Sequence, residues 1–354
     1  MSEFVGSPYL SVIIPAYNEE QVIVRNITEV AEYLYRTLGR EKAFEIIVVD
    51  DGSTDQTGQV LQLQAAERPY LRVFRHSDNY GRGRALRTGF EHVSGSFVVT
   101  LDADLSYSPD HIARMLAPLE RDEADIVLAS AYHPEGSVMD VPWKRALISR
   151  MGNWLLARSL SGQKLNTLTC VVRAYKKEVI DTLELFSDDK DIHLEIINKT
   201  RMLGFRIAEI PAQLRWKPEK RTTGKKGLSL KTFLGMSSRH LFFNFLFRPS
   251  LLSMLPILIL GMIVLVLSFT LVRGYAYFLS LTDAATGWMR YYLALRVHIQ
   301  EAAISYSIWG LCLLLLFQFV SLVFIAKQNN YHYRELFCTL SRISRSLKDI
   351  ERKK

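Results

Sequence analysis

The sequence predicts a doubly wound α/β domain with a mostly parallel sheet, followed by a membrane-anchored carboxyl-terminal third. Three observations lead to this fold class. Short apolar runs alternate with helical patterns over residues 9–211, which is typical of parallel sheets covered by helices. Polar clusters follow several of these runs directly. Two long segments without a charged residue lie beyond residue 249.

The expected strands are short apolar runs, each closed by a turn or a proline. They lie at residues 9–15, 44–49, 71–74, 97–101, 124–130 and 205–211. Helices are expected between them, where apolar residues recur at helical spacing. The clearest such pattern comprises Ile23, Ile27, Val30, Ala31 and Leu34; further helices are expected through Leu61, over residues 85–93, from His111, and along Ile192, Ile196 and Ile197.

The run at residues 97–101 ends at two carboxylates, Asp102 and Asp104, one residue apart. They stand at the carboxyl end of a buried strand, which is where open α/β sheets bind ligands. Two hard oxygen donors at that edge suit Mg²⁺ or Mn²⁺ holding a diphosphate. The alternative is a polar turn whose acids cap the next helix, and the neighbouring motifs have to decide between the two.

Other expected strand ends carry similar groups. Residues 16–20 follow the first strand, and residues 50–55, Asp-Asp-Gly-Ser-Thr-Asp, follow the second. After the third strand two glycines bracket Arg82. They let the backbone approach a ligand closely, while Arg82 and Arg84 can meet its phosphates. Polar groups thus gather at several ends of one sheet.

Residues 250–272 and 302–326 contain no charged residue, and each exceeds the roughly 20 apolar residues that a membrane-spanning helix needs. The alternative, a buried core helix, fits segments this long and uncharged poorly. Residues 229–249 mix Phe and Leu with Lys and Arg, as interfacial helices do. The sequence therefore predicts an α/β domain over residues 1–228, amphipathic juxtamembrane helices over 229–249, a transmembrane hairpin over 250–326 and a basic tail over 327–354.

Basic residues are concentrated on the outer flanks of this hairpin. Residues 215–248 contain nine Lys or Arg and one acid, and residues 327–354 contain eight and three. Because Lys and Arg stay on the cytoplasmic side, we expect a multi-pass protein with the α/β domain and both termini in the cytoplasm. The net charge of +8 then favours anionic membrane lipids or phosphate ligands over nucleic acid. Three scattered cysteines and no recognisable signal peptide fit a reducing compartment.

Taken in order, these motifs resemble the signatures of family 2 inverting glycosyltransferases with the GT-A fold. They are Val-Ile-Ile-Pro-Ala-Tyr-Asn-Glu at 12–19, Val-Val-Asp-Asp-Gly-Ser-Thr-Asp at 48–55, Asn79-x-Gly81 and Asp102-Ala103-Asp104. Within the family, the chain is similar to polyprenyl-phosphate glycosyltransferases such as dolichyl-phosphate mannosyltransferase and its bacterial relatives. The resemblance is strong over residues 9–110 and looser to about residue 230, and beyond that it rests on layout.

This resemblance implies roles for the residues of the motifs. Nucleotide base and ribose would contact Pro15, Tyr17, Glu19 and Asp51, and Asp102, Ala103 and Asp104 would hold the metal and diphosphate, with Arg82 as a further donor-binding residue. A basic loop, with Arg221, Lys225 and Lys226, matches one that contacts donor and lipid phosphates in the relatives, so the expected catalytic set is Asp102, Asp104 and Arg221. The alternative for this loop is a patch that binds lipid headgroups, and both roles can coexist.

The expected reaction is the transfer of a sugar, with inversion, from a nucleotide-diphosphate sugar to a polyprenyl phosphate of the undecaprenyl or dolichyl type. The cofactor is Mg²⁺ or Mn²⁺, and the other partners are membrane lipids, not nucleic acid. Two alternatives stay open: a glycosyltransferase for another lipid or glycan acceptor, and a non-catalytic membrane scaffold. The sugar, the base and the prenyl length are open as well, as is the oligomeric state, a homo-oligomer included.

The chain departs from the relatives' pattern at three positions. Ala131 stands where they often have arginine, Thr167 lies where an acid is expected, and Gly227 replaces a lysine. Arg173 is interpreted either as a functional residue or as a helix-entry residue, with equal weight. The acidic cluster around Glu195 is interpreted as a solvated helix face, and His193 as structural.

Overall fold

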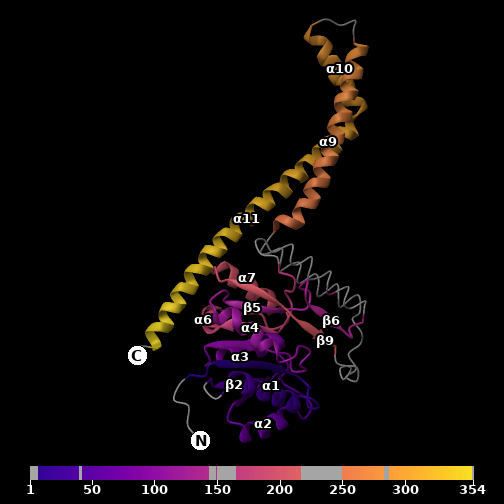
Figure 1. Cartoon of the computed structure of the whole chain (residues 1–354). Coiled ribbons are helices and arrows are strands. Elements are labelled where there is room, and N and C mark those ends of the chain that lie inside the picture. Colours follow the sequence, from indigo (N-terminus) through magenta and orange to yellow (C-terminus); the bar gives the residue numbers. More distant parts are fainter. Residues whose placement is uncertain are drawn as a thin grey trace. The chain divides into compact units, whose positions relative to one another are not determined.

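The computed structural model of the chain describes residues 7–39, 42–142, 149, 165–216, 249–282 and 287–352. It divides into two compact units, one formed by residues 1–233 with 336–354 and the other by residues 234–335. The boundaries predicted from the sequence at residues 228 and 249 therefore stay a prediction. Each unit is described separately (Figure 1).

The first unit contains a seven-stranded sheet in the order β3-β2-β1-β4-β7-β5-β8, which is parallel except for β7. The predicted α/β fold with a mostly parallel sheet is confirmed. Its strands are β1 (Leu10–Ala16), β2 (Phe44–Asp50), β3 (Leu71–Arg75), β4 (Phe97–Thr100), β5 (Ile126–Ser130), β7 (Arg173–Lys176) and β8 (Ile207–Pro211). A separate parallel pair joins β6 (Ser137–Met139) to β9 (Gln213–Arg215).

Helices cover both faces of this sheet (Figure 1). Buried residues of α1 (Ile23–Leu38), α2 (Thr57–Glu67) and α4 (His111–Glu120) share one apolar cluster, and those of α3 (Arg82–Glu91), α6 (Lys177–Thr182) and α7 (Ile192–Met202) share the other. Successive strand residues point to opposite faces, so Val12 and Ile14 join the first cluster and Ile13 the second. Apolar runs without alternation follow from this two-sided burial. All five residues of the helical pattern predicted from Ile23 to Leu34 are buried on α1, as expected.

The chain order creates a switch point in the sheet between β1 and β4. From β1 the chain adds β2 and β3 on one side and then crosses to place β4 on the other side. At such a point the connections leave the sheet in opposite directions, and the gap outside the carboxyl ends of the strands can take a ligand. Pro15 near the end of β1 and Asp102 just after β4 both stand there.

Strand β7 corrects the interpretation of Arg173. The residue is neither a helix-entry residue nor exposed: it begins β7, pairs antiparallel with Thr100 and is fully buried. Its guanidinium donates to the carbonyls of Cys170, His193 and Leu168 at 2.9, 3.1 and 2.7 Å. Through these three bonds Arg173 ties the start of α7 to the sheet, so it is a structural residue.

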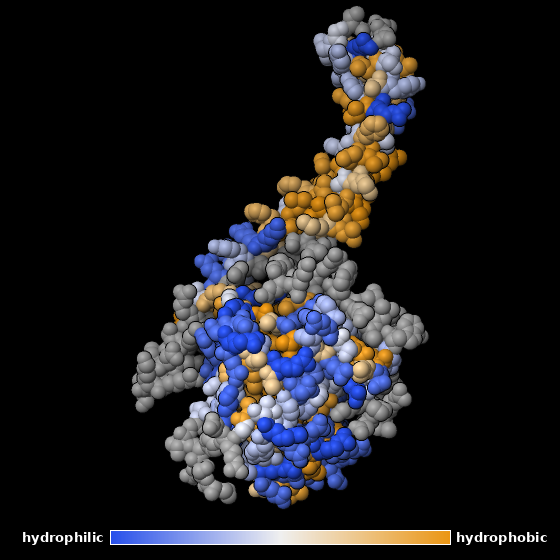
Figure 2. All heavy atoms as spheres, viewed as in Figure 1, coloured by the Kyte–Doolittle hydropathy of each residue, from blue (hydrophilic) through white to orange (hydrophobic). Residues whose placement is uncertain are grey.

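The second unit contains two helices long and apolar enough to cross a membrane, spanning Met254–Leu281 and Ala303–Leu340. They belong to α9 (Pro249–Leu281) and α11 (Ala303–Arg352), and Figure 2 shows apolar side chains gathered along α9 and the adjoining part of α11. The segment between the predicted spans is largely helical, because α9 continues to Leu281 and α10 (Trp288–Glu301) follows.

Helix α10 packs against α9 through a buried histidine. The Nε2 of His298 donates to the carbonyl of Leu271 at 2.9 Å, and a Cβ at Gly274 would lie 2.5 Å from the His298 ring. The absence of a side chain at position 274 therefore makes room for the ring. Sequence hydropathy could not show this, because it ends the first span at the charge of Arg273.

A buried carboxylate holds the amino-terminal edge of the sheet, opposite the switch point. Glu45 accepts hydrogen bonds from the Ser11 hydroxyl at 2.6 Å, from the backbone and hydroxyl of Ser94 at 2.8 and 2.6 Å, and from Arg72 at 2.7 Å. Burial by itself would raise the pKa of Glu45, but these hydrogen bonds outweigh it and lower the pKa below its usual value.

We expect Glu45→Gln to lower the free energy of unfolding by about 2 kcal/mol at pH 7, because charge-assisted bonds are lost. The ionised form stabilises the fold above the unfolded-state pKa of about 4.3, and this stabilisation disappears as the pH falls through the lowered folded-state pKa. Denaturant unfolding at pH 7 and below pH 4 measures the difference between the variant and the wild type. A difference of equal size at both pH values would contradict this assignment.

Candidate functional site

The loops that follow β1 and β2 are joined by hydrogen bonds between side chains and backbone. The side-chain oxygen of Asn18 accepts from the Thr54 backbone amide at 2.8 Å, and the backbone amide of Asn18 donates to the Ser53 hydroxyl at 3.0 Å. The Glu19 amide donates to the Thr57 hydroxyl at 2.9 Å. Asn18 adopts a positive φ of 53°, which asparagine tolerates better than most residues. The loops after β1 and β2 are therefore joined, and together they form one side of the candidate site at the carboxyl edge of the sheet.

The two carboxylates of the Asp102-Ala103-Asp104 motif lie at the same edge, on a tight turn. The Leu105 amide donates to the Asp102 carbonyl at 3.1 Å, and Leu105 has a positive φ of 48°. Asp104 is buried, and its Oδ1 accepts from the Ser106 amide and hydroxyl at 3.0 and 2.7 Å. A leucine in the left-handed region costs about 1 kcal/mol, so packing of the buried Leu105 has to hold the turn.

Helix α1 supports this turn through Asn26, a residue that the sequence analysis missed. Asn26 is buried, and its Nδ2 donates to the carbonyl of Ala103 at 2.7 Å. The backbone between Asp102 and Asp104 is thereby anchored to α1. No local pattern marks Asn26, because its partner lies 77 residues away in the sequence.

Asp102 and Asp104 fit a divalent cation that takes only one or two ligands from the protein. In the described part of the chain, no group of three or more His, Cys, Asp or Glu side chains is placed to hold a metal ion. Mg²⁺ is typically bound by one or two protein carboxylates, with substrate phosphates and water completing its coordination shell. The pair of hard oxygen ligands at this edge matches that arrangement and not a closed structural site.

Arg82 brings a positive charge to the same place. It is the first residue of α3, and its Nη1 lies 3.6 Å from Oδ1 of Asp102. Both side chains are partly exposed. A carboxylate pair beside a guanidinium can bind a metal–diphosphate complex, since the cation meets the carboxylates and the guanidinium meets the phosphate oxygens.

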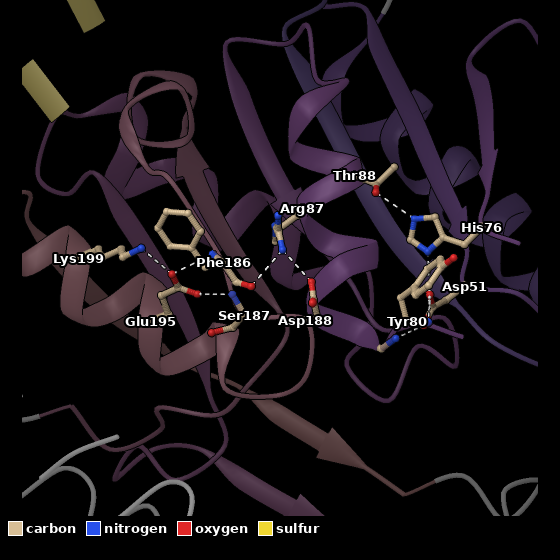
Figure 3. Close-up of polar contacts among 11 residues, drawn as sticks. Asp51, His76, Tyr80, Arg87, Thr88, Phe186, Ser187, Asp188, Glu195 and Lys199 are labelled. Carbon is tan, nitrogen blue, oxygen red and sulfur yellow. Dashed lines mark hydrogen bonds and ion pairs between the residues drawn. The ribbon is translucent and has the colours of Figure 1, made fainter. Parts of the chain in front are cut away.

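Asp51 is buried and satisfied by the loop that follows β3 (Figure 3). Its Oδ1 accepts from the Tyr80 amide at 3.1 Å and from His76 Nδ1 at 2.7 Å, and its Oδ2 accepts from the Gly81 amide at 2.8 Å. The other ring nitrogen of His76 lies 2.9 Å from the Thr88 hydroxyl. Asp51 thus holds the loop that leads into Arg82, and His76 is a second residue that sequence patterns did not reveal.

The predicted donor-site residues are therefore gathered at one edge: Pro15 near the end of β1, Tyr17 and Glu19 after it, Asp51 after β2, Arg82 at the start of α3, and Asp102, Ala103 and Asp104 after β4. Their ligand contacts stay predictions. The three residues expected to bind the acceptor phosphate, Arg221, Lys225 and Lys226, lie outside the described residues, as does most of the predicted interfacial segment 229–249.

Two glutamates correct the sequence analysis. Glu195 is buried and accepts from the backbone amides of Phe186 and Ser187 at 3.0 and 2.8 Å, so the prediction that its cluster is a solvated face was wrong for Glu195. Glu209 on β8 accepts from the amides of Asn166 and Thr167 at 2.8 Å each. A carboxylate thus stands beside Thr167, where the motif lacked an acid, but it comes from another strand.

A groove of about 560 Å³ lies between α3 and α6, lined among others by Arg87, Phe90, Lys177 and Ile180. It contains none of the predicted site residues. The motif residues, not the size of a groove, therefore define the candidate site.

Comparison with known proteins identifies the part of the chain that carries these motifs. Residues 11–184 match the family model described as "Glycosyl transferase family 2". The chain is 31% identical over 272 residues to glycosyltransferase AglD of Haloferax volcanii, covering 75% of this chain and 42% of that protein. It is 32% identical over 219 residues to undecaprenyl-phosphate 4-deoxy-4-formamido-L-arabinose transferase of Edwardsiella ictaluri, covering 60% of this chain and 62% of that protein.

The chain thus spans 42% and 62% of the lengths of these two relatives. Among solved structures it is similar to the glucosyl-3-phosphoglycerate synthase of M. tuberculosis. The sequence identity is 23% and the TM-score 0.47, over 67% of this chain and 78% of that one.

We expect Asn26→Leu to weaken Mn²⁺ binding at the carboxylate pair about tenfold. Leucine has a similar size but leaves the buried Ala103 carbonyl without its donor, which costs about 1–3 kcal/mol. Electron paramagnetic resonance of Mn²⁺ measures the affinity. Thr28→Val, which removes a hydrogen bond to Val24 on the same helix, is the control and should bind like the wild type. Equal affinity in all three proteins would show that Asn26 does not support the turn.

Proposed function

We propose that the chain transfers a sugar from a nucleotide-diphosphate sugar to a polyprenyl phosphate, with inversion, because residues 11–184 match the model of glycosyl transferase family 2. The products are a polyprenyl-phosphate sugar and a nucleoside diphosphate. One observation carries the proposal: Arg82 lies 3.6 Å from Asp102 at the switch point of the sheet, and Asp104 follows on the same turn. This arrangement suits a metal-bound diphosphate that has to leave.

The donor is proposed to lie across the carboxyl ends of β1, β2 and β4. Pro15, Tyr17 and Glu19 contact base and ribose, and Asp51 contributes through the loop that it holds. Asp102 and Asp104 would hold Mg²⁺ or Mn²⁺, and the cation would neutralise charge on the diphosphate leaving group. Arg82 binds a phosphate oxygen of the same group. The hydrogen bonds that join the loops at residues 17–19 and 53–57 support a preformed site.

The proposed reaction is a single displacement. A phosphate monoester is largely dianionic near pH 7, since its second pKa is about 6. One of its oxygens forms a bond to the anomeric carbon, while the bond from that carbon to the diphosphate oxygen breaks. No proton has to be removed from the nucleophile, so no general base is assigned. The protein has to align the two substrates and stabilise the leaving group.

The acceptor is proposed to reach this site from the membrane. Two apolar helices, α9 and α11, support membrane attachment, and the basic flanks support a cytoplasmic α/β domain and cytoplasmic termini. Arg221, Lys225 and Lys226 are proposed to bind the lipid phosphate, because they precede the membrane segment closely in the sequence. Accessibility of terminal tags to protease in sealed, right-side-out cells tests the topology, and exposed termini would overturn it.

Two other functions compete with this one. A glycosyltransferase for another lipid or glycan acceptor shares the donor site, and product analysis separates it. A non-catalytic scaffold is motivated by the departures at Ala131, Thr167 and Gly227, although Glu209 places a carboxylate beside Thr167. The buried, hydrogen-bonded Asp104 also supports an intact site.

We expect Asp104→Asn to reduce sugar transfer by at least a hundredfold while the fold is kept, because a neutral amide binds Mg²⁺ poorly. Radiolabelled nucleotide sugars are incubated with membranes and polyprenyl phosphate, and the lipid product is counted. Asp181→Asn on α6, which removes a partly exposed pair with Lys177, serves as the control. Near-normal turnover of Asp104→Asn would exclude this carboxylate from the reaction.

We expect Arg221→Ala, and the double change Lys225→Ala with Lys226→Ala, to lower kcat/KM for polyprenyl phosphate roughly ten- to a hundredfold. Charge-assisted contacts are worth about 1.5–3 kcal/mol each. The affinity for the free nucleoside diphosphate should change much less, because the donor residues stay in place. Kinetics in detergent, where bilayer charge is absent, separate the two roles. Wild-type acceptor kinetics in both variants would leave the loop with headgroup binding only.

A further inference from the structure

We propose that residues 186–189, here called the supporting segment, position Arg82 for the donor diphosphate, and that Glu195, Lys199 and Arg87 are the positioning residues that hold this segment. The inference rests on the proposed function, since it assigns Arg82 a ligand. The three positioning residues lie outside the sequence motifs. Figure 3 shows the hydrogen bonds of Glu195 and Arg87 with the supporting segment, and the ion pair of Glu195 with Lys199.

The start of α3 lacks the groups that normally stabilise a helix amino terminus. Its first turn contains no acidic residue, and its N-cap residue, Gly81, makes no side-chain hydrogen bond. Instead Arg82 and Arg84 place positive charge where the helix dipole is already positive, which is unfavourable. Four backbone amides there also need acceptors from outside the helix. Arg82 is therefore well placed for a phosphate but stands on a helix end that depends on other parts of the chain.

The supporting segment provides part of what is missing. The carbonyl of Asp188 accepts from the Arg84 amide at 3.0 Å. A Cβ at Gly81 would lie 2.5 Å from the Asp188 carbonyl oxygen, and one at Gly83 would lie 2.5 Å from that of Ser187. The backbone of the segment therefore packs directly on the first turn of α3. The two glycines that bracket Arg82 allow this contact.

Asp51 holds the same turn from the other side. Its Oδ2 accepts from the Gly81 amide at 2.8 Å. Arg82, between Gly81 and Gly83, is thus fixed by a carboxylate at the end of β2 and by a backbone segment that precedes α7. With both supports present, its guanidinium lies 3.6 Å from Asp102.

The supporting segment is in turn held by a buried ion pair. Glu195 accepts from the amides of Phe186 and Ser187, and also from Lys199 Nζ at 2.5 Å, with both charged side chains only 3% exposed. Burial would raise the pKa of Glu195, but the hydrogen bonds from Lys199 and Ser187 lower it. A buried pair contributes little net stability compared with apolar residues. Here it supplies an ionised carboxylate that can accept two backbone amides.

Arg87 is the second tether. It donates to the carbonyl of Phe186 at 3.0 Å and to Oδ1 of Asp188 at 2.7 Å. Since Arg87 lies on α3 itself, it links the supporting segment to the helix that the segment supports. Removing this side chain loosens the contact without leaving a buried charge, because Asp188 is largely exposed.

The chain offers a matched control. Arg72 also donates to one carboxylate and one backbone carbonyl, namely Glu45 at 2.7 Å and His92 at 2.8 Å, but at the opposite edge of the sheet. We expect Arg87→Met to lower kcat/KM for the sugar donor on the order of tenfold, because a small misplacement of a binding group is costly. Arg72→Met should change kcat/KM by less than about twofold, because among the described residues Arg72 shares no partner with Arg82 or with the supporting segment.

A double-mutant cycle with Arg82 tests whether the effect passes through that residue. In an Arg82→Met background, Arg87→Met should cost less than a further factor of about two, since residues in one network are not additive. An equal loss in both backgrounds overturns the proposal. The double variant Glu195→Gln with Lys199→Met removes the buried charges together, which avoids an unpaired lysine, and should behave like Arg87→Met. A wild-type kcat/KM in it also overturns the proposal.

Hydrogen exchange at the Arg84 amide gives a readout that needs no reaction. It should accelerate about tenfold in Arg87→Met and stay unchanged in Arg72→Met, because weaker tethering raises the population of the open form. Unchanged exchange in Arg87→Met overturns the proposal, and so does faster exchange with unaltered donor kinetics. If exchange responds as expected while the wild type uses no nucleotide sugar, the proposed function fails and the support of α3 by this segment stands.

Discussion

The site depends on buried carboxylates that accept hydrogen bonds from the backbone of loops far away in the sequence. A buried carboxylate is stable only if its oxygens find donors, and peptide amides in loops need acceptors as well. The buried Asp51 and Glu195 meet both needs at once, and the partly buried Glu209 acts in the same way, each holding two backbone amides. Loops that would otherwise sample many conformations are fixed in this way.

The parallel sheet gives Asp51 and the Asp102–Asp104 pair their common location. Six of its seven strands, all except β7, run the same way, and their carboxyl ends meet at one edge. Burial on both faces makes the strands rigid, whereas the loops beyond them carry the polar groups. Asp102 and Asp104 stand on a turn whose backbone is anchored to α1 by Asn26. A rigid sheet thus presents the proposed diphosphate site, which is built almost wholly from loops.

The antiparallel strand β7 lies between β4 and β5, so it separates β1–β4 from β5 and β8. Its first residue, Arg173, donates hydrogen bonds to three backbone carbonyls. A buried guanidinium needs such acceptors, and they come from the loop before β7 and from α7. The same helix carries Glu195 and Lys199. Helix α7 therefore links the far half of the sheet to the supporting segment beside α3.

Local patterns in the sequence determined all the strands of the main sheet except β7, the helix from Ile23, the apolar spans and the gathering of motif residues at one edge. Periodicity and strand-end chemistry are short-range properties, so they can be read without the fold. Only the tertiary structure decided what Asn26, His76, Arg173 and Glu195 do. Their partners lie 77, 25, 20 and 9 residues away. A polar side chain looks the same in a sequence whether it is solvated or buried, because the difference depends on which distant amides the fold brings to it.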